Sequence, residues 1–386
     1  MNKNFIDWVQ ELIGKKQKIK KLMEAKAISD QEEILHILAW MPSWIGDVVQ
    51  ALPSLQTLRR IYPNARITVI TRFPTGQLLS GHKEIVDTIL QFPKNKADGY
   101  IKQCADAWKL RKYKFDLGII FPNSFHSAFM LMLMGARVRI GYSTDKRQLL
   151  LTHPISTTQK EKKTLYRVNY FHKILFPLNS KLSPERYHFK WTSSSQILKK
   201  VLKARELDRK DCLITIHPGA SKIERAWHAE RFGILCQNLI KAYPVKIILL
   251  GNNKEKSLLE KISSFCPSQN IRIIEKLDLT EIAQLINISK LFIGNDSGLL
   301  HMASLANTPV VGIFGPGQAA TTGPFIDIER QEIVTRNYPC SPCRQRFFEE
   351  CIPSLHHKPE CLESISVTEV SKAIEKIVRR LGLFKK

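Results

Sequence analysis

The sequence predicts an α/β protein in which two doubly wound parallel-sheet domains face each other across a cleft. Short apolar runs alternate with helical segments from residue 34 onward, which is typical of a parallel sheet covered by helices on both faces. The alternation stops near residue 177 and then begins again. A chain of 386 residues is also long enough for two domains of ordinary size. A cleft between such domains is a favoured place for a ligand.

The first domain is predicted to span residues 33–181. Its apolar runs predict strands at 34–40, 66–71, 85–92, 115–121 and 137–141. Helical patterns occupy 47–62, 105–113 and 166–176, and the segment 177–184, with a proline at each end, indicates a linker.

The second domain is predicted to span residues 182–366. It repeats the pattern, with strands at 213–217, 245–250, 271–274, 291–293 and 310–314 and helices at 229–242, 254–265, 281–288 and 299–306. The remaining segment, 367–386, contains a helix at 367–381 with apolar residues along one side. We expect this helix to pack back onto the body of the protein.

Residues 1–32 form an amino-terminal extension with a basic, amphipathic pattern. Apolar residues recur there at helical spacing, and a lysine-rich window follows: Phe5, Trp8, Val9, Leu12 and Ile13, then Lys15, Lys16, Lys18, Lys20 and Lys21. Such a helix can lie in an anionic membrane interface. It can equally pack on the domain behind it with its lysines in solvent.

The composition indicates a globular protein with a polyanionic partner. Lys and Arg exceed Asp and Glu by 59 to 35, a net charge of +24 that suits nucleic acid, an anionic membrane surface or a phosphorylated substrate. No apolar run is long enough to span a membrane, since even 125–136 is too short, and no secretory signal opens the chain. The sequence therefore predicts a cytoplasmic location. The lysines are dispersed and no RNA-binding signature accompanies them, which disfavours nucleic acid.

Residues 294–301, Gly-Asn-Asp-Ser-Gly-Leu-Leu-His, follow a predicted buried strand and open a helix. The first N–H groups of a helix lack internal partners and carry the positive end of its dipole, so they suit a phosphate group. Asp296 and Ser297 suit an N-cap, Gly298 permits close approach of a ligand to the backbone, and His301 lies one turn later. The simpler interpretation is an ordinary capped turn.

Two further loops follow predicted strands in the same way. In the first, Gly46 allows close backbone approach and Asp47 lies at a helix start, where the dipole would keep it ionised and fit to act as a general base. Its simpler role is N-capping. The second loop offers a glycine turn, a hydroxyl and a guanidinium for phosphate oxygens: Gly219, Ser221 and Arg225.

Three segments together resemble glycosyltransferase family 9, the ADP-heptose:lipopolysaccharide heptosyltransferases, and in particular heptosyltransferase II. They are MPSWIGDVVQALPSLQTLRRIYP, HPGAS with the later tryptophan Trp227, and GNDSGLLHMASLANTPVVGIFGP. The resemblance covers roughly residues 34–380. It implies a GT-B fold with Rossmann-like domains, the acceptor on the first and the sugar nucleotide on the second. It also implies transfer of heptose from ADP-heptose to the inner core of lipopolysaccharide, with inversion.

The resemblance assigns the catalytic aspartate to Asp47 and nucleotide binding to Asp296, Ser297, Gly298 and His301. Members of the family often carry lysine where this chain has Arg225, so the donor's sugar or phosphate contacts can differ here. The partners implied are ADP-heptose or a related sugar nucleotide and a phosphorylated lipid A-core acceptor. An enzyme with such an acceptor is expected on the inner face of the cytoplasmic membrane, as a peripheral protein.

The same residues predict catalysis without a metal or another cofactor. Inversion needs one in-line displacement, with a base at the acceptor hydroxyl and stabilisation of the leaving diphosphate on the opposite side. The chain contains no Asp-x-Asp sequence. Helix N-termini and Arg225 would therefore have to take the diphosphate charge.

Four cysteines cluster in the segment 340–361: Cys340, Cys343, Cys351 and Cys361, with His356 and His357 among them. This composition suits a structural zinc site, although the later spacings are irregular for a known zinc finger. Free or paired thiols that stabilise a loop are the alternative.

The sequence leaves two other functions open. A nucleotide-sugar epimerase can share a GT-B scaffold, and a basic nucleic-acid-binding protein would explain the charge. The sequence does not name the donor sugar, the acceptor hydroxyl or the oligomeric state.

Overall fold

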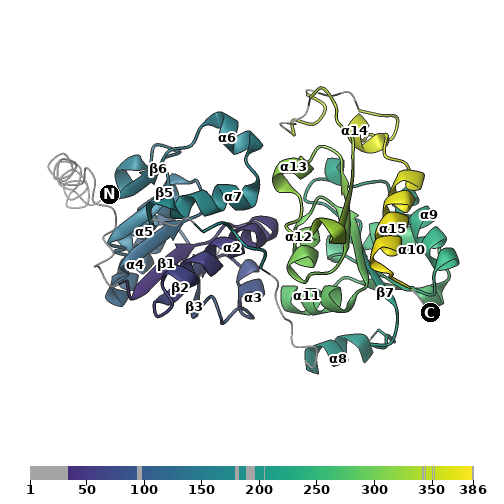
Figure 1. The fold of residues 1–386 in the computed structure, drawn as a ribbon, viewed down its shortest axis with the longest axis horizontal. Helices are drawn as coiled ribbons and strands as arrows, with labels where there is room; N and C mark the ends of the chain where they lie inside the picture. Colours follow the sequence, from purple (N-terminus) through teal and green to yellow (C-terminus); the bar gives the residue numbers. More distant parts are fainter. Residues whose placement is uncertain are drawn as a thin grey trace.

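The protein contains two six-stranded sheets in which every paired strand is parallel (Figure 1), as a computed structural model shows. The structure describes residues 34–93, 98–178, 182–187, 196–203, 205–340, 343, 345–349, 351 and 353–384. The predicted extension 1–32 and parts of the linker lie outside these residues. Two parallel sheets with helices around them confirm the predicted α/β class.

The first sheet has the strand order β3-β2-β1-β4-β5-β6. Its strands are β1 (His36–Trp40), β2 (Arg66–Thr71), β3 (Thr88–Gln91), β4 (Leu117–Ile120), β5 (Val138–Tyr142) and β6 (His153–Ile155). The helices that accompany it are α2 (Ile45–Ile61), α3 (Thr75–Leu79), α4 (Tyr100–Lys109), α5 (Phe125–Leu133), α6 (Gln159–Thr164) and α7 (Arg167–His172).

The second sheet has the order β12-β11-β10-β7-β8-β9. Its strands are β7 (Leu213–His217), β8 (Lys246–Leu250), β9 (Ile271–Ile274), β10 (Leu291–Asn295), β11 (Val310–Phe314) and β12 (Gln331–Thr335). Its helices are α8 (Gln196–Lys203), α9 (Ala229–Ala242), α10 (Lys256–Ser263), α11 (Leu279–Ile288), α12 (Gly298–Leu305), α13 (Ala319–Thr322), α14 (Glu360–Glu363) and α15 (Val367–Leu381).

The apolar runs located the central strands, and the differences from the prediction lie at the edges. β6 and β12 were not predicted, because edge strands are only half-buried and carry no continuous apolar run. α5 was missed because it is apolar on nearly all sides, which removes the helical period from its sequence. The helix predicted at 166–176 is α7 followed by a 3₁₀ turn, Lys173–Leu178, that contains Pro177.

The two domains pack directly on each other. α2 of the first domain lies against α12 of the second, and the apolar side chains of both join one core (Figure 1). At the same boundary Gln50 Nε2 and the hydroxyl of Tyr166 both donate to the carbonyl oxygen of Gly323, at 3.1 and 2.9 Å. α15 packs on α9 and β12 of the second domain. Among the residues described, no helix is long and apolar enough to cross a membrane.

Candidate functional site between the domains

The amino-terminal ends of α2 and α12 meet where the two domains face each other (Figure 1). A Cβ placed on Gly46 would lie 2.7 Å from Cδ2 of His301, and one on Gly298 would lie 2.9 Å from Cβ of Ile45. Each helix therefore approaches the other through a glycine that a larger residue could not replace without a shift. Because both helix ends point into this boundary, two positive dipole ends converge on it. The structure thus brings the predicted base loop and the predicted phosphate loop together.

Asp47 is the third residue of α2 and is about one-third exposed. The cap position belongs to Trp44, and no side chain caps this helix, so the N-capping alternative for Asp47 is wrong. Arg167 Nε lies 3.9 Å from Asp47 Oδ1. Burial raises the pKa of the Asp47 carboxyl, and the Arg167 guanidinium opposes that rise. A carboxyl with a raised pKa is a better proton acceptor, which suits a general base.

Asp296 pairs with Arg225 across the second-domain loops. The Arg225 guanidinium donates to a carboxylate oxygen of Asp296 and, through Nη2, to its backbone oxygen at 2.9 Å. The prediction that Asp296 caps α12 is therefore wrong: Ser297 holds the cap position, without a side-chain cap bond. Local sequence favoured the cap because Asp is common there, whereas a guanidinium 71 residues away offers a stronger charged partner.

The remaining predicted donor residues lie around His217, at the end of β7. His217 Nδ1 and Ser297 Oγ form a hydrogen bond of 3.1 Å. Burial lowers the pKa of His217 to about 4, so this ring is neutral at pH 7. Gly219 lies beside it under the carboxylate of Glu255, where any Cβ would clash at 1.8 Å from Oε1. Ser221 accepts only a long hydrogen bond of 3.5 Å from Arg225 Nη1.

His301, in the first turn of α12, lies against Gly46 of α2 and is 95% buried. Its Nδ1 has no hydrogen-bond partner, and burial lowers the pKa of its ring, with Asp296 and Arg225 acting in opposite directions. A neutral imidazole with one unpaired nitrogen can donate a hydrogen bond to a ligand at the domain boundary or accept one from it.

Sequence reasoning missed two residues that hold the site together. Asn295 is fully buried; its amide donates to the carbonyl oxygen of Pro218 at 2.7 Å and accepts from the backbone N–H of Trp227 at 3.1 Å. It therefore connects the loops after β7 and β10. Glu255, beside Gly219, ends the 3₁₀ turn Asn253–Glu255 that follows β8, and it had no motif to mark it. The only signal for Asn295 was its polar side chain at the end of an apolar strand.

None of the four clustered cysteines, Cys340, Cys343, Cys351 and Cys361, forms a disulfide in the structure. Burial and the neighbouring thiols Cys343, Cys340 and Cys351 raise the pKa of Cys361 to about 12. Within the described part of the chain, the group whose ligand atoms all lie within 4.8 Å of one another is His228, His356 and Glu363, and it contains no cysteine. The four-cysteine zinc site stays a prediction.

Comparison with known proteins places this chain in a family. The family model for glycosyltransferase family 9 (heptosyltransferase) matches residues 106–351. The chain is 24% identical to lipooligosaccharide heptosyltransferase 2 of Campylobacter jejuni over 357 residues, covering 90% of this chain and 100% of the relative. The corresponding enzyme of Haemophilus influenzae is 26% identical over 304 residues, covering 76% and 87%.

A solved structure shares the fold. The structure of Escherichia coli ADP-heptose lipopolysaccharide heptosyltransferase II superimposes with a TM-score of 0.75 at 20% identity and covers 90% of this chain and 100% of its own. This likeness confirms the predicted GT-B arrangement. The family match also favours glycosyl transfer over the epimerase and nucleic-acid alternatives. This chain belongs to glycosyltransferase family 9, the heptosyltransferases.

Proposed function

We propose that this protein transfers heptose from ADP-heptose, or a related sugar nucleotide, to a phosphorylated inner-core sugar of the lipid A-core, with inversion at the anomeric carbon. Membership of the heptosyltransferase family supports the reaction class, and the names of the relatives suggest the donor and acceptor. The observation that carries the proposal is the meeting of the two helix ends, which brings the loop with Asp47 to that with Gly298 and His301.

In the proposed reaction the acceptor oxygen attacks the anomeric carbon of the donor while the bond to the β-phosphate breaks. Asp47 takes the proton of the acceptor hydroxyl, and the nucleoside diphosphate leaves with the bonding electrons. The free N–H groups at the start of α12 and the guanidinium of Arg225 would stabilise the charge on that leaving group. We therefore propose that the transfer needs no divalent metal.

The same proposal places the protein on the inner face of the cytoplasmic membrane, where a lipid-linked acceptor lies. The net charge of +24 favours an anionic lipid surface, and part of that charge comes from the lysine-rich segment within residues 1–32.

A direct assay tests the proposed reaction. The purified full-length protein is incubated with ADP-heptose, or in parallel with other sugar nucleotides, and with a phosphorylated lipid A-core acceptor. We expect release of ADP and a gain of one heptose in the mass of the acceptor, both lost in Asp47→Asn. Conversion of the sugar nucleotide without an acceptor would contradict transfer and support an epimerase.

A further inference from the structure

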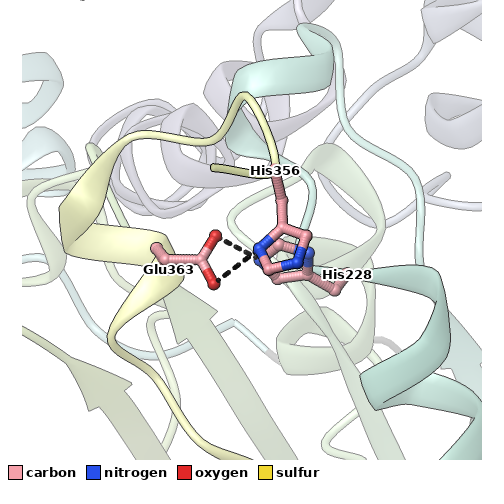
Figure 2. Close-up of side chains that lie close together, drawn as sticks. All are labelled: His228, His356 and Glu363. Carbon is pink, nitrogen blue, oxygen red and sulfur yellow. Dashed lines mark hydrogen bonds and ion pairs between the residues drawn. The ribbon is translucent and has the colours of Figure 1, made fainter. Parts of the chain in front are cut away.

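Three side chains from distant parts of the chain converge on one another: His228, His356 and Glu363 (Figure 2). His228 precedes the first residue of α9, His356 lies in the segment between β12 and α14, and Glu363 ends α14. His228 Nε2 is 3.1 Å from Glu363 Oε2, and His356 Nδ1 is 3.2 Å from Glu363 Oε1. The two imidazole rings lie nearly perpendicular, with their centroids 5.4 Å apart.

One of these groups is buried without a hydrogen bond. His228 is 92% buried, and its Nε2, although close to Glu363, is not aligned to form a hydrogen bond with any atom. Buried polar atoms in folded proteins nearly always have a partner, so an unpaired ring nitrogen directed at a carboxylate calls for one. His356 is 65% exposed, so an ion from solvent can reach the group from that side.

The carboxylate is held in place from behind. Arg231 Nη2 donates to Glu363 Oε1 at 2.7 Å, and the hydroxyl of Ser354 donates to Oε2 at 2.7 Å. A carboxylate has about four lone-pair sites, so these two bonds leave sites for a metal. Outer partners of this kind orient the ligands in known metal centres. The positive charge of Arg231 disfavours a cation at this place. Its hydrogen bond, however, holds the Glu363 carboxylate in an orientation that favours metal binding.

We propose that His228, His356 and Glu363 form a divalent metal site that takes zinc, separate from the four cysteines. Two imidazole nitrogens and a carboxylate oxygen are ligands that zinc accepts, and a fourth position on the exposed side is open to water. The site joins the carboxyl-terminal segment to the chain three residues after Arg225. A bound ion would therefore fix the loop that contains Arg225 against α14.

Zinc binding to the full-length protein tests this proposal, with His356→Asn as the main variant. The neighbouring His357→Asn is the matched control, since it removes an exposed imidazole one residue away and asparagine tolerates the positive φ of 54° at that position. A third variant, Cys340→Ala/Cys343→Ala/Cys351→Ala, removes three thiols and keeps the buried Cys361. Metal-free protein is titrated with zinc against a chromophoric chelator, and thermal unfolding is recorded with and without zinc.

We expect His356→Asn to weaken zinc binding by at least about tenfold. Mutation of a residue that only hydrogen-bonds to a metal ligand typically costs 10–100-fold in affinity, and loss of a ligand itself should cost at least as much. His357→Asn and the cysteine variant should retain the wild-type affinity and the zinc-dependent rise in unfolding temperature. Equal affinity of His356→Asn and wild type would overturn the proposal, as would loss of zinc only in the cysteine variant. Because His356 is mostly exposed, its variant should fold normally, which unfolding without zinc verifies.

Discussion

Arg167 influences the pKa of Asp47 at the boundary between the domains. They are 3.9 Å apart, and Asp47 is the carboxylate that the first domain presents there at a helix start. Burial raises the pKa of Asp47, and Arg167 lowers it. Replacing either residue should therefore change the rate of the reaction or its dependence on pH.

Asp47→Asn should retain the fold and donor affinity but lose turnover. The amide keeps the shape of the side chain yet cannot accept a proton, and removal of a general base typically costs on the order of 10² to 10⁴ in rate. Steady-state kinetics and calorimetry with ADP separate the two effects. Turnover within about threefold of wild type would show that Asp47 is not the base.

The pH profile gives a second test at the same residue. A base must be ionised, so kcat/KM should fall as pH decreases through the raised pKa of Asp47, above its ordinary value of 3.8. Because Arg167 lowers that pKa, Arg167→Gln should move the acid limb to higher pH. The acid limb, the fall in kcat/KM at low pH, is located by measuring the rates of the wild type and of Arg167→Gln across a pH series. A limb that stays in place or moves to lower pH would contradict the pairing.

At the scale of the elements, two helix ends form the site, and each approaches the other through glycine. A helix amino terminus offers free N–H groups, and here the amino termini of α2 and α12 face the same domain boundary. In the proposed reaction, this arrangement would let the protein hold a diphosphate with backbone groups and would place the base opposite. Arg225 is partly neutralised by Asp296, so the backbone groups carry more of that role than the sequence suggested.

Gly46→Ala should impair the approach of the two helices. The added Cβ would lie 2.7 Å from the His301 ring, and misplacement by about 1 Å can cost about 10²-fold in rate. Gly99→Ala is the matched control, because no atom lies within 4 Å of its Cβ position. We expect a large fall in kcat/KM for the first variant only, with similar unfolding temperatures. Equal activity of both variants would show that the contact is not needed.

Removal of metal tests the role of the helix ends. If N–H groups and Arg225 stabilise the diphosphate, transfer should continue at the same rate immediately after addition of excess EDTA. A slow decline accompanied by unfolding would indicate a structural ion instead. Immediate loss of activity that magnesium restores would contradict metal-independent transfer. The same assay on His356→Asn shows whether a slow decline comes from the metal site proposed at His228, His356 and Glu363.

At the scale of the whole molecule, one apolar core passes from the first domain into the second through α2 and α12. The hydrogen bonds at Gly323 and the packing of α2 hold the domains close in this structure. Opening of the two domains for substrate entry and product release would have to separate these contacts, so the interface and the site are coupled.

Deletion of residues 1–30 should weaken binding to membranes. Each lysine near an anionic surface contributes about 1 kcal/mol, and inserted apolar side chains add a contribution that salt does not screen. Sedimentation with anionic liposomes across a salt series measures this effect, with detergent-solubilised acceptor as the activity control. Transfer to that acceptor should remain normal. If the truncated protein sediments as the full chain does, the extension is a packed helix.

The sequence by itself determined the α/β class, the central strands of both sheets and which three loops are candidates for the chemistry. These properties depend on local patterns: buried parallel strands are apolar throughout, and helix starts require particular residues. The bounds predicted for strands 213–217, 271–274 and 310–314 and for helix 367–381 agree with the structure because their apolar faces are unambiguous.

The tertiary structure decided which side chains pair. Arg225 joins Asp296 across 71 residues, and Glu363 joins His228 across the second domain, although no local pattern links them. Gly46 and His301 meet only because α2 and α12 pack together. Charge pairing and close packing act through space, whereas propensity acts along the chain. The sequence therefore identified the candidate residues of each loop but not their partners.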